Sequence, residues 1–310
     1  MAGVKNSPLK EFHIEMGAKM VPRFNWNLPL HFSEGTVEEH LWCRSRCAMF
    51  DICSDGKFRI AFPGAAAALE KFLFFKSSTL APGSCRRDIM TGTDGSIIAG
   101  VRIAVMAEDD IFLAVSLPGV NNCLQLLQKE KIAFSDLSEY LAGIGLHGPQ
   151  AAEVLSLCGM DVNELPGVQQ SKLRELDGLR VIMTGSDITG TPGYDIFFNA
   201  GCADQIWDLF LDTDIPRPAG IAAMESLRLE HGVWENGAEL TPLRKAADLE
   251  AHLGLIFFDT RQFPLPGTAL PAAEDHGEAT VLAGAFVPTL KKSAVSVWFT
   301  GAVTSADSRQ

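Results

Sequence analysis

Short strand-like runs alternate with helical patterns along most of the chain, and this alternation limits its fold more than any other feature. Apolar or alternating runs bounded by Gly, Pro and Asp predict β-strands at 57–62, 97–105, 111–116, 180–184 and 193–198. Helical spacing, twice opened by a proline, predicts helices at 36–48, 64–75, 119–131, 149–158, 203–211 and 219–231. Helices interleaved with strands over short connections indicate an α+β or α/β protein.

The C-terminal part has a different composition. The stretch from Phe263 to Gly277 contains three prolines and two glycines without periodicity, which predicts a linker. Two strand-like runs follow within 279–299, and the last residues read as a solvated tail. Because two strands alone do not form a stable sheet, we expect them to pack on the main body.

Composition and charge exclude several classes of protein. With 47% hydrophobic and 21% charged residues in 310, the chain can bury a full core. A net charge of -12 argues against nucleic acid or an anionic membrane as partner. No run approaches the roughly 18 to 20 apolar residues of a membrane span, and no signal segment is recognisable, so we expect a soluble cytoplasmic protein.

Cysteine and glycine patterns give little support for metal or nucleotide chemistry. His40, Cys43 and Cys47 would share one face of the predicted helix 36–48, with Cys53 just beyond. A soft metal could use such a face, but no second cluster exists and a buried stripe of thiols is the simpler interpretation, so we predict no metal. The chain also lacks GxGxxG, GxxxxGK[ST] and GxSxG motifs.

Few charged residues stand out from their surroundings. Asp109 and Asp110 fit a solvated hairpin turn, and Arg228 with Glu230 fits a surface ion pair. Asp195 differs because it lies in the otherwise apolar strand 193–198. Its carboxylate either faces solvent on an alternating strand or points into a cleft, and the pattern leaves both open.

Seven segments together resemble the aminomethyltransferase of the glycine cleavage system, the T protein, and its folate-binding relatives. They occur in the family's order and cover most of the chain. The segments are GAKMVPRFNWNLPLHF (17–32), CRSRCAMFDICS (43–54), TGTDGSIIAGVRI (91–103), IGLHGPQAAEVL (144–155), GSDITGTPGYDI (185–196), PAGIAAMESLRLEHG (218–232) and GAFVPTLKKSAVSVWF (284–299).

The resemblance implies an α+β ring of two intertwined lobes around a central folate cleft, followed by a C-terminal β-barrel. It divides this chain into a folate-binding region, 1–262, and a linker with a shortened barrel remnant, 263–310. Within the first region, one lobe would combine roughly 1–50 with 142–232, and the other 51–141 with 233–262. The chain is short for the family, so only part of the barrel is expected.

The implied chemistry moves an aminomethyl group from a lipoyl arm to tetrahydrofolate with release of ammonia. The family's catalytic aspartate belongs to a motif resembling GGxxDD, which here reads GSIIAG and places Ala99 and Gly100 where the acids belong. Losing a positioned general acid or base typically costs about 10² to 10⁴ in rate. The resemblance therefore implies that activity at the parent level is lost.

Other ligand-binding positions of the family are partly retained. The pterin-binding acid is carried over as Asp195, and Arg228 is a retained arginine. At the remaining positions the family residues are replaced, namely by Ile188, Thr191, Met224, Asp55 and Arg87, and the aromatic lining the cleft is matched by Phe112 or Leu113.

Three functions remain open on this basis. The first is a tetrahydrofolate-dependent aminomethyltransferase-like enzyme handling one-carbon units, in which Asp55 or Asp88 would serve as a relocated carboxylate and a lipoyl carrier protein could be the partner. The second is a non-catalytic folate-binding accessory or regulatory protein. The third is a protein whose ligand is no longer a folate. Arg86, Arg87 and Asp88 could equally form a solvated strand edge.

Overall fold

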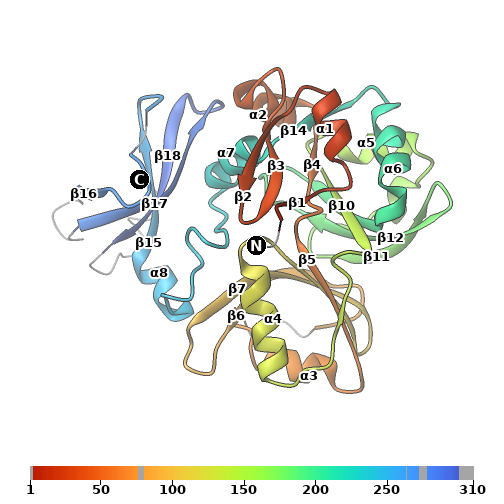
Figure 1. Cartoon of the computed structure of the whole chain (residues 1–310), viewed down its shortest axis with the longest axis horizontal. Coiled ribbons are helices and arrows are strands. Elements are labelled where there is room, and N and C mark those ends of the chain that lie inside the picture. The colour runs from red at the N-terminus through yellow and green to blue at the C-terminus, as the bar shows by residue number, and fades with distance from the viewer. Residues whose placement is uncertain (1–2, 76–79, 263, 272–277, 300–310) are drawn as a thin grey trace.

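The computed structural model describes residues 3–75, 80–262, 264–271 and 278–299, and it arranges them around four β-sheets (Figure 1). The largest sheet has the strand order β11-β12-β13-β10-β4-β14, and a second has the order β6-β7-β8-β5-β9. Every pair in these sheets is antiparallel except β4 with β14. The described part of the chain is therefore the mixed α+β protein that the sequence predicts.

The six-stranded sheet is covered on one side by α5 (Ala151–Leu157) and α6 (Ala203–Leu211). In α6, Ile206, Trp207 and Phe210 recur at helical spacing and are all fully buried against this sheet. The strands are β4 (Cys47–Asp51), β10 (Leu141–His147), β11 (Ser171–Leu176), β12 (Leu179–Ser186), β13 (Gly193–Asn199) and β14 (Pro216–Ala219).

The five-stranded sheet carries α3 (Ala65–Glu70) and α4 (Gly119–Lys129) on its outer face. Cys123, Leu126 and Leu127 of α4 are buried on that face. The strands are β5 (Gly56–Ala61), β6 (Cys85–Thr91), β7 (Ile97–Ala107), β8 (Asp110–Val115) and β9 (Ser135–Asp136).

The two large sheets meet through their inner faces. Ala104, Phe112 and Ala114 from the second sheet pack against Phe197 of the first, and the rings of Phe112 and Phe197 lie 5.0 Å apart. The chain crosses from the first sheet to the second between β4 and β5, through residues 52–55. Residues near this crossing can therefore contribute to a site between the sheets.

A three-stranded sheet of order β1-β3-β2 and the helices α1, α2 and α7 complete this side of the molecule. Its strand β3 and helix α2 both pack against α7. These elements are β1 (Lys5–Asn6), α1 (Lys10–Glu15), β2 (Lys19–Arg23), β3 (Trp26–His31), α2 (Thr36–Ser45) and α7 (Ile221–His231).

The C-terminal sheet has the order β15-β18-β17-β16 and fits a shortened barrel. It packs on α7 through Leu229, Ala285 and Val287, so the predicted strands of 279–299 do rest on the main body. The elements are α8 (Leu249–His252), β15 (Leu253–Phe258), β16 (Ala269–Pro271), β17 (Glu278–Val287) and β18 (Lys292–Phe299). Three short 3₁₀ turns occur at Val162–Glu164, Ala200–Cys202 and Ala246–Asp248.

Two predictions from the sequence require correction. The linker of 263–277 contains strand β16, while its residues 263 and 272–277, and the predicted tail, lie outside the described residues. The helix expected over 36–48 ends at Ser45, because Cys47 begins β4, which pairs with both β10 and β14. His40, Cys43 and Cys47 therefore do not share one helix face.

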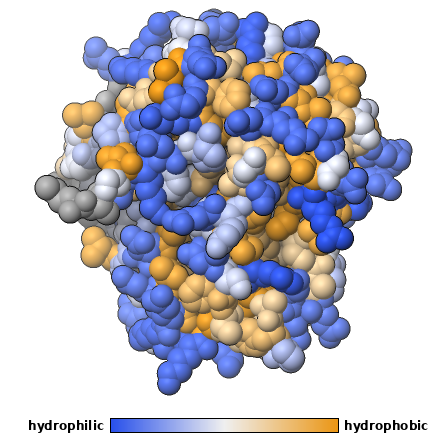
Figure 2. Space-filling view, turned by 45° about the vertical axis from the view of Figure 1, so that its right-hand side comes forward, coloured by the Kyte–Doolittle hydropathy of each residue, from blue (hydrophilic) through white to orange (hydrophobic). Residues whose placement is uncertain are grey.

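The outer surface carries both hydrophilic and hydrophobic residues. Figure 2 shows hydrophilic residues over much of one face, with hydrophobic residues gathered between them. None of the helices in the described ranges is long and apolar enough to cross a membrane.

Candidate functional site

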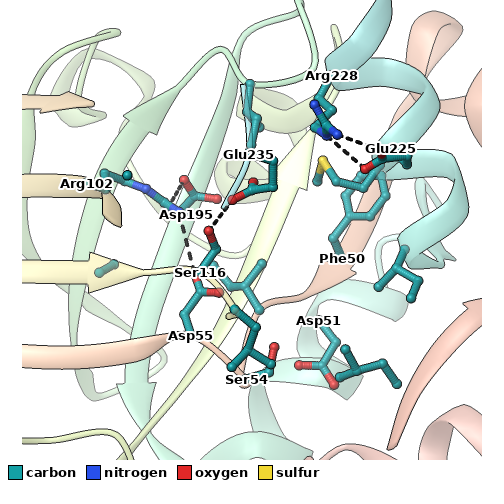
Figure 3. Close-up of a pocket in the computed structure, with 18 of the residues that line it drawn as sticks. Phe50, Asp51, Ser54, Asp55, Arg102, Ser116, Asp195, Glu225, Arg228 and Glu235 are labelled. Atoms are coloured by element: carbon teal, nitrogen blue, oxygen red, sulfur yellow. Dashed lines mark hydrogen bonds and ion pairs between the residues drawn. The ribbon is translucent and has the colours of Figure 1, made fainter. Parts of the chain in front are cut away.

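A cleft with a volume of about 150 Å³ lies where the two large sheets, the N-terminal sheet and α7 approach one another (Figure 3). Its lining combines apolar side chains with several carboxylates and guanidinium groups. Among the lining residues are these predicted positions: Asp55, Arg87, Gly100, Ile188, Asp195, Met224 and Arg228.

Strand β7 explains why some of these residues face the cleft. Side chains alternate along a strand, so Gly100 and Arg102 face the first sheet, whereas Ala99, Val101 and Ile103 pack into the core under α4. On the inner face of β7, Gly100 therefore presents no side chain to the cleft, and Arg102, two residues later, presents a long positively charged one.

Other predicted binding residues lie elsewhere. Phe112 and Leu113 point to opposite faces of β8, but both faces are covered, so each is a core residue. Thr191 shares a hydrogen bond of 2.9 Å with the hydroxyl of Thr189. None of the three lines the cleft in the described part of the protein, and their assignment to it is therefore corrected.

Asp88 is a structural residue of β6 and does not line the cleft. Its carboxylate accepts hydrogen bonds from the amides of Phe75 at 3.0 Å and Ile89 at 2.7 Å, and it pairs with Arg86 at 2.9 Å. The side chain is almost fully buried, so the expectation of a solvated strand edge is wrong for Asp88.

Asp195 points inward from the centre of the largest sheet, so the solvent-facing alternative is wrong. It is 2% exposed and lies on β13 between β12 and β10. One carboxylate oxygen accepts from Nη1 of Arg102, and the other lies 3.3 Å from Nε2 of His147. Burial alone would raise the pKa of Asp195, but Arg102, with His147 and Ser186, lowers it to about 2.

Glycines make room for this arrangement. A Cβ at Gly145 would lie 2.8 Å from Nε2 of His147, and a Cβ at Gly193 would lie 2.3 Å from its Nδ1. Gly145, on the same strand β10 as His147, and Gly193, on the neighbouring strand β13, therefore leave space for the imidazole ring. This space lets the ring lie against Asp195.

Arg102 connects two carboxylates across the cleft. Besides its bond to Asp195, its Nη2 lies 3.6 Å from Oδ2 of Asp55, and its guanidinium carbon is 5.9 Å from the ring centre of Phe197. Figure 3 shows the guanidinium between the two acids. Burial tends to lower the pKa of Arg102, but the two carboxylates raise it, so its charge is permanent.

Asp55 belongs to the connection between β4 and β5 and is fixed by a buried lysine. Nζ of Lys57 donates to the carbonyls of Cys53 at 2.7 Å and Asp55 at 2.9 Å. Burial raises the pKa of the Asp55 carboxyl to about 6, although Arg102 and Lys57 act in the opposite direction. A carboxyl with this pKa can both give and take a proton near neutral pH.

Neighbouring residues fill the space beside Gly100, the position to which the sequence resemblance assigns the catalytic acid. The amide of Gly100 donates to Oδ1 of Asn236 at 2.6 Å, and Nδ2 of Asn236 donates to the carbonyls of Gly100 at 2.9 Å and Ser116 at 3.1 Å. A Cβ at Gly100 would lie 2.6 Å from Cδ1 of Leu240. Any side chain there would require Leu240 to move.

Arg228 is held in a buried network. It is 1% exposed, contacts Glu225 at 2.5 Å and lies 3.3 Å from Glu239. Glu230 instead pairs with Arg44 at 2.5 Å and lies 3.3 Å from His40. The expected surface ion pair between Arg228 and Glu230 is therefore wrong, because α7 directs the two side chains to different partners.

Sequence reasoning missed several polar residues of the cleft. Arg102 is the one charged residue in the run Ile97–Ala107, a signal as clear as that of Asp195. Glu235, which lines the cleft and accepts from the hydroxyl of Ser116, lies in an irregular segment after α7 that carries no periodic pattern, and its neighbour Asn236 bonds to Gly100 behind the cleft wall. Their role could not be found without the fold.

Comparison with known proteins assigns the family. The model of the GCVT N-terminal domain matches residues 9–257, which is most of the chain. The chain belongs to this family. Curated relatives include an aminomethyltransferase of Flavobacterium psychrophilum, 28% identical over 84% of this chain and 73% of the relative. Another, from Halothermothrix orenii, is 25% identical over 91% of this chain and 80% of the relative.

A solved structure supports the family fold. The glycine cleavage system aminomethyltransferase T of Bartonella henselae superimposes with a TM-score of 0.84 at 24% identity, covering 96% of this chain and 90% of that one. The GCVT family membership and this likeness together establish the T-protein fold with a shortened C-terminal sheet.

Proposed function

We propose that this GCVT-family protein binds a reduced folate in the cleft and handles a one-carbon unit there. One observation carries the proposal: positions far apart in the sequence, from Asp55 to Arg228, line a single cleft in a chain of this family. The cleft has apolar walls at Phe50, Ile188 and Met224 and charged groups around them, which suits a flat polar ligand.

Asp55 is the proposed proton-handling group. It lines the cleft and has a pKa close to the operating pH, whereas Asp88 does not line the cleft and is held by two amides and Arg86. A ligand amine beside Asp55 could exchange a proton with it directly. In this proposal Asp55 substitutes for the acid missing at Gly100.

Asp195 already has a partner on each carboxylate oxygen. Arg102 and His147 take one acceptor site on each, which leaves fewer for paired hydrogen bonds with the amino edge of a pterin. We therefore propose that Asp195 orients Arg102, and that the guanidinium of Arg102 faces the ligand.

A second function, folate binding without turnover, is favoured by the filled space at Gly100. Because Leu240 and Asn236 occupy the position of the parent acid, the parent reaction has no carboxyl there. In that case the lipoyl carrier protein, the partner proposed for the enzyme, would not be needed.

Calorimetry and a transfer assay would separate these functions. We expect saturable binding of tetrahydrofolate, and transfer from an aminomethylated lipoyl carrier that follows a pH profile with an inflection near the pKa of Asp55, about 6. D55N should lose turnover and keep binding, while the control D110N, at an exposed pair with Arg59 on the surface hairpin, should keep both. Binding without any turnover would select the accessory function, and absence of binding would refute both.

A further inference from the structure

Arg87 is an accessible cation at the junction of two cavities. It lies on β6 and lines both the cleft and a neighbouring cavity of about 640 Å³. Arg87 is exposed to solvent, and the protein atoms around it lower its pKa by burial, although Glu235 acts in the opposite direction. The side chain is therefore placed where a ligand in either cavity could contact it.

The guanidinium of Arg87 has few partners of its own. Among the described residues, its only hydrogen bond is to the carbonyl of Trp234, at 3.4 Å, and no carboxylate lies within ion-pair distance. A guanidinium carries five N–H donors, so most of them have no acceptor in the part of the protein that the structure describes. Asp88, which lines the same second cavity, is already taken by Arg86.

The neighbouring arginines are neutralised differently. Arg102 is the direct cross-strand partner of Arg87 in the pairing of β6 with β7, and it has two carboxylates. Arg228, across the cleft, also has two. Like charges opposite each other on adjacent strands repel, so the uncompensated charge at Arg87 favours an added anion.

The second cavity provides a surface for the body of such a ligand. Phe74, Phe75 and Trp234 line it, and the rings of Phe74 and Phe75 lie 5.0 Å apart. A carboxylate joined to a flat or apolar group could place the charge on Arg87 and the group against these rings. Arginine recognises carboxylates through two parallel hydrogen bonds, which fits a planar acid.

We propose that Arg87 is the anchor for a carboxylate of the ligand, so that the substrate of this site is an organic acid spanning the cleft and the second cavity. This deepens the proposed function and rests on it for the use of the cleft. We take this carboxylate to be the glutamate end of a folate, which an ion pair with the guanidinium of Arg87 would hold.

Calorimetry with three probes tests the anchor. Tetrahydrofolate carries the carboxylate arm, 6-methyltetrahydropterin lacks it, and p-aminobenzoylglutamate is the arm alone. We expect R87L to weaken binding of the probes with a carboxylate by about 10- to 100-fold and to leave the armless pterin unchanged. The affinity of R87K for these probes should lie between those of R87L and the unmodified protein. Lysine keeps the positive charge but cannot form the two parallel hydrogen bonds.

Matched variants and distinct outcomes keep the test decisive. R59L removes an exposed arginine on β5, paired with Asp110 of the neighbouring strand β8, and should change no affinity, and circular dichroism of each variant checks folding. If both folate probes bind and R87L changes nothing, the anchor is refuted while the proposed function stands. If only p-aminobenzoylglutamate binds and R87L abolishes it, the anchor stands and the folate proposal fails. If no probe binds, both are refuted.

Discussion

Arg102 donates to the carboxylate of Asp195, so the acid that the family pattern assigns to ligand binding already holds a cation of the same chain. The same guanidinium reaches toward Asp55, 3.6 Å away. The charge in the cleft therefore depends on Arg102, Asp195 and Asp55 together.

Removing Arg102 should leave two buried carboxylates without their cation. We expect R102L to lower the free energy of unfolding at pH 7 by about 3–5 kcal/mol, measured by urea denaturation. The loss should shrink at low pH, where protonation neutralises both acids. R59L, at the exposed pair with Asp110, should cost under about 1 kcal/mol. Equal losses in the two variants would contradict the buried role of Arg102.

The raised pKa of Asp55 predicts a specific dependence of stability on pH. A carboxyl with a folded pKa of about 6 and an ordinary value of 3.8 stabilises the fold most below the lower value. That contribution to the free energy of unfolding, roughly 3 kcal/mol in total, is lost as the pH rises through the folded-state pKa of about 6. The free energy of unfolding of D55N relative to the unmodified protein should therefore increase between pH 4 and pH 7. A constant difference across this range would show that Asp55 titrates normally.

Asp195 should show the opposite sign. Its pKa is depressed to about 2 from 3.8, so its contribution is present above the ordinary value and disappears as pH falls toward the folded one. We expect D195N to lose stability relative to the unmodified protein at pH 7, with the gap closing between about pH 4 and pH 2. NMR titration of the carboxyl carbon checks the pKa itself; a midpoint near the ordinary value would contradict the pairing with Arg102.

The filled space at Gly100 predicts that the parent acid cannot simply be restored. G100D should destabilise the protein by about 1–3 kcal/mol, because the new Cβ would lie 2.6 Å from Leu240. G100D with L240A should recover part of that loss beyond the sum of the single changes. G167A adds a methyl group where the nearest atom is 3.5 Å away and serves as the control. Additive effects of the two changes would show that Leu240 is not the obstacle.

Arg228 should couple α7 to the C-terminal sheet. R228M would leave Glu239 buried with the hydroxyl of Ser296 on β18 but without its cation, at a cost of about 3–5 kcal/mol. Hydrogen exchange of β18 should rise more than that of β13. R228M with E239Q should recover much of the loss, and failure to do so would locate the effect in Glu225 instead.

The sequence predicted the elements with a strong period better than the site. Strands β7, β8 and β13 and helices α4, α6 and α7 are confirmed near their expected bounds, since each has a buried face repeated over several residues. The helix predicted over 36–48 extends into the first two residues of β4, and the rest of this strand was not predicted, because Cys47–Asp51 is buried almost throughout and shows no alternation.

The site depended on partners that the resemblance did not indicate. It indicated Asp195 and Arg228, but not that Arg102 and Glu225 occupy them. The pairing of Arg102 with Asp195 arises where β7 faces β13 and follows from packing between the sheets, whereas Glu225 and Arg228 are an i,i+3 pair within α7. Phe112 packs against Phe197 between the two large sheets, whereas Ala114, two residues later on the same face of β8, lines the cleft.

The position of Lys57 has a mechanical consequence. The chain passes between the two large sheets through residues 52–55, and the ammonium of Lys57 clamps the carbonyls of Cys53 and Asp55 in this short crossing. A hinge motion of one sheet against the other would have to bend this clamped segment. It would also change the separation between Asp55 and Arg102, which comes from the opposite wall. A ligand that draws the two sheets together would thereby change the pKa of Asp55, the carboxyl beside it.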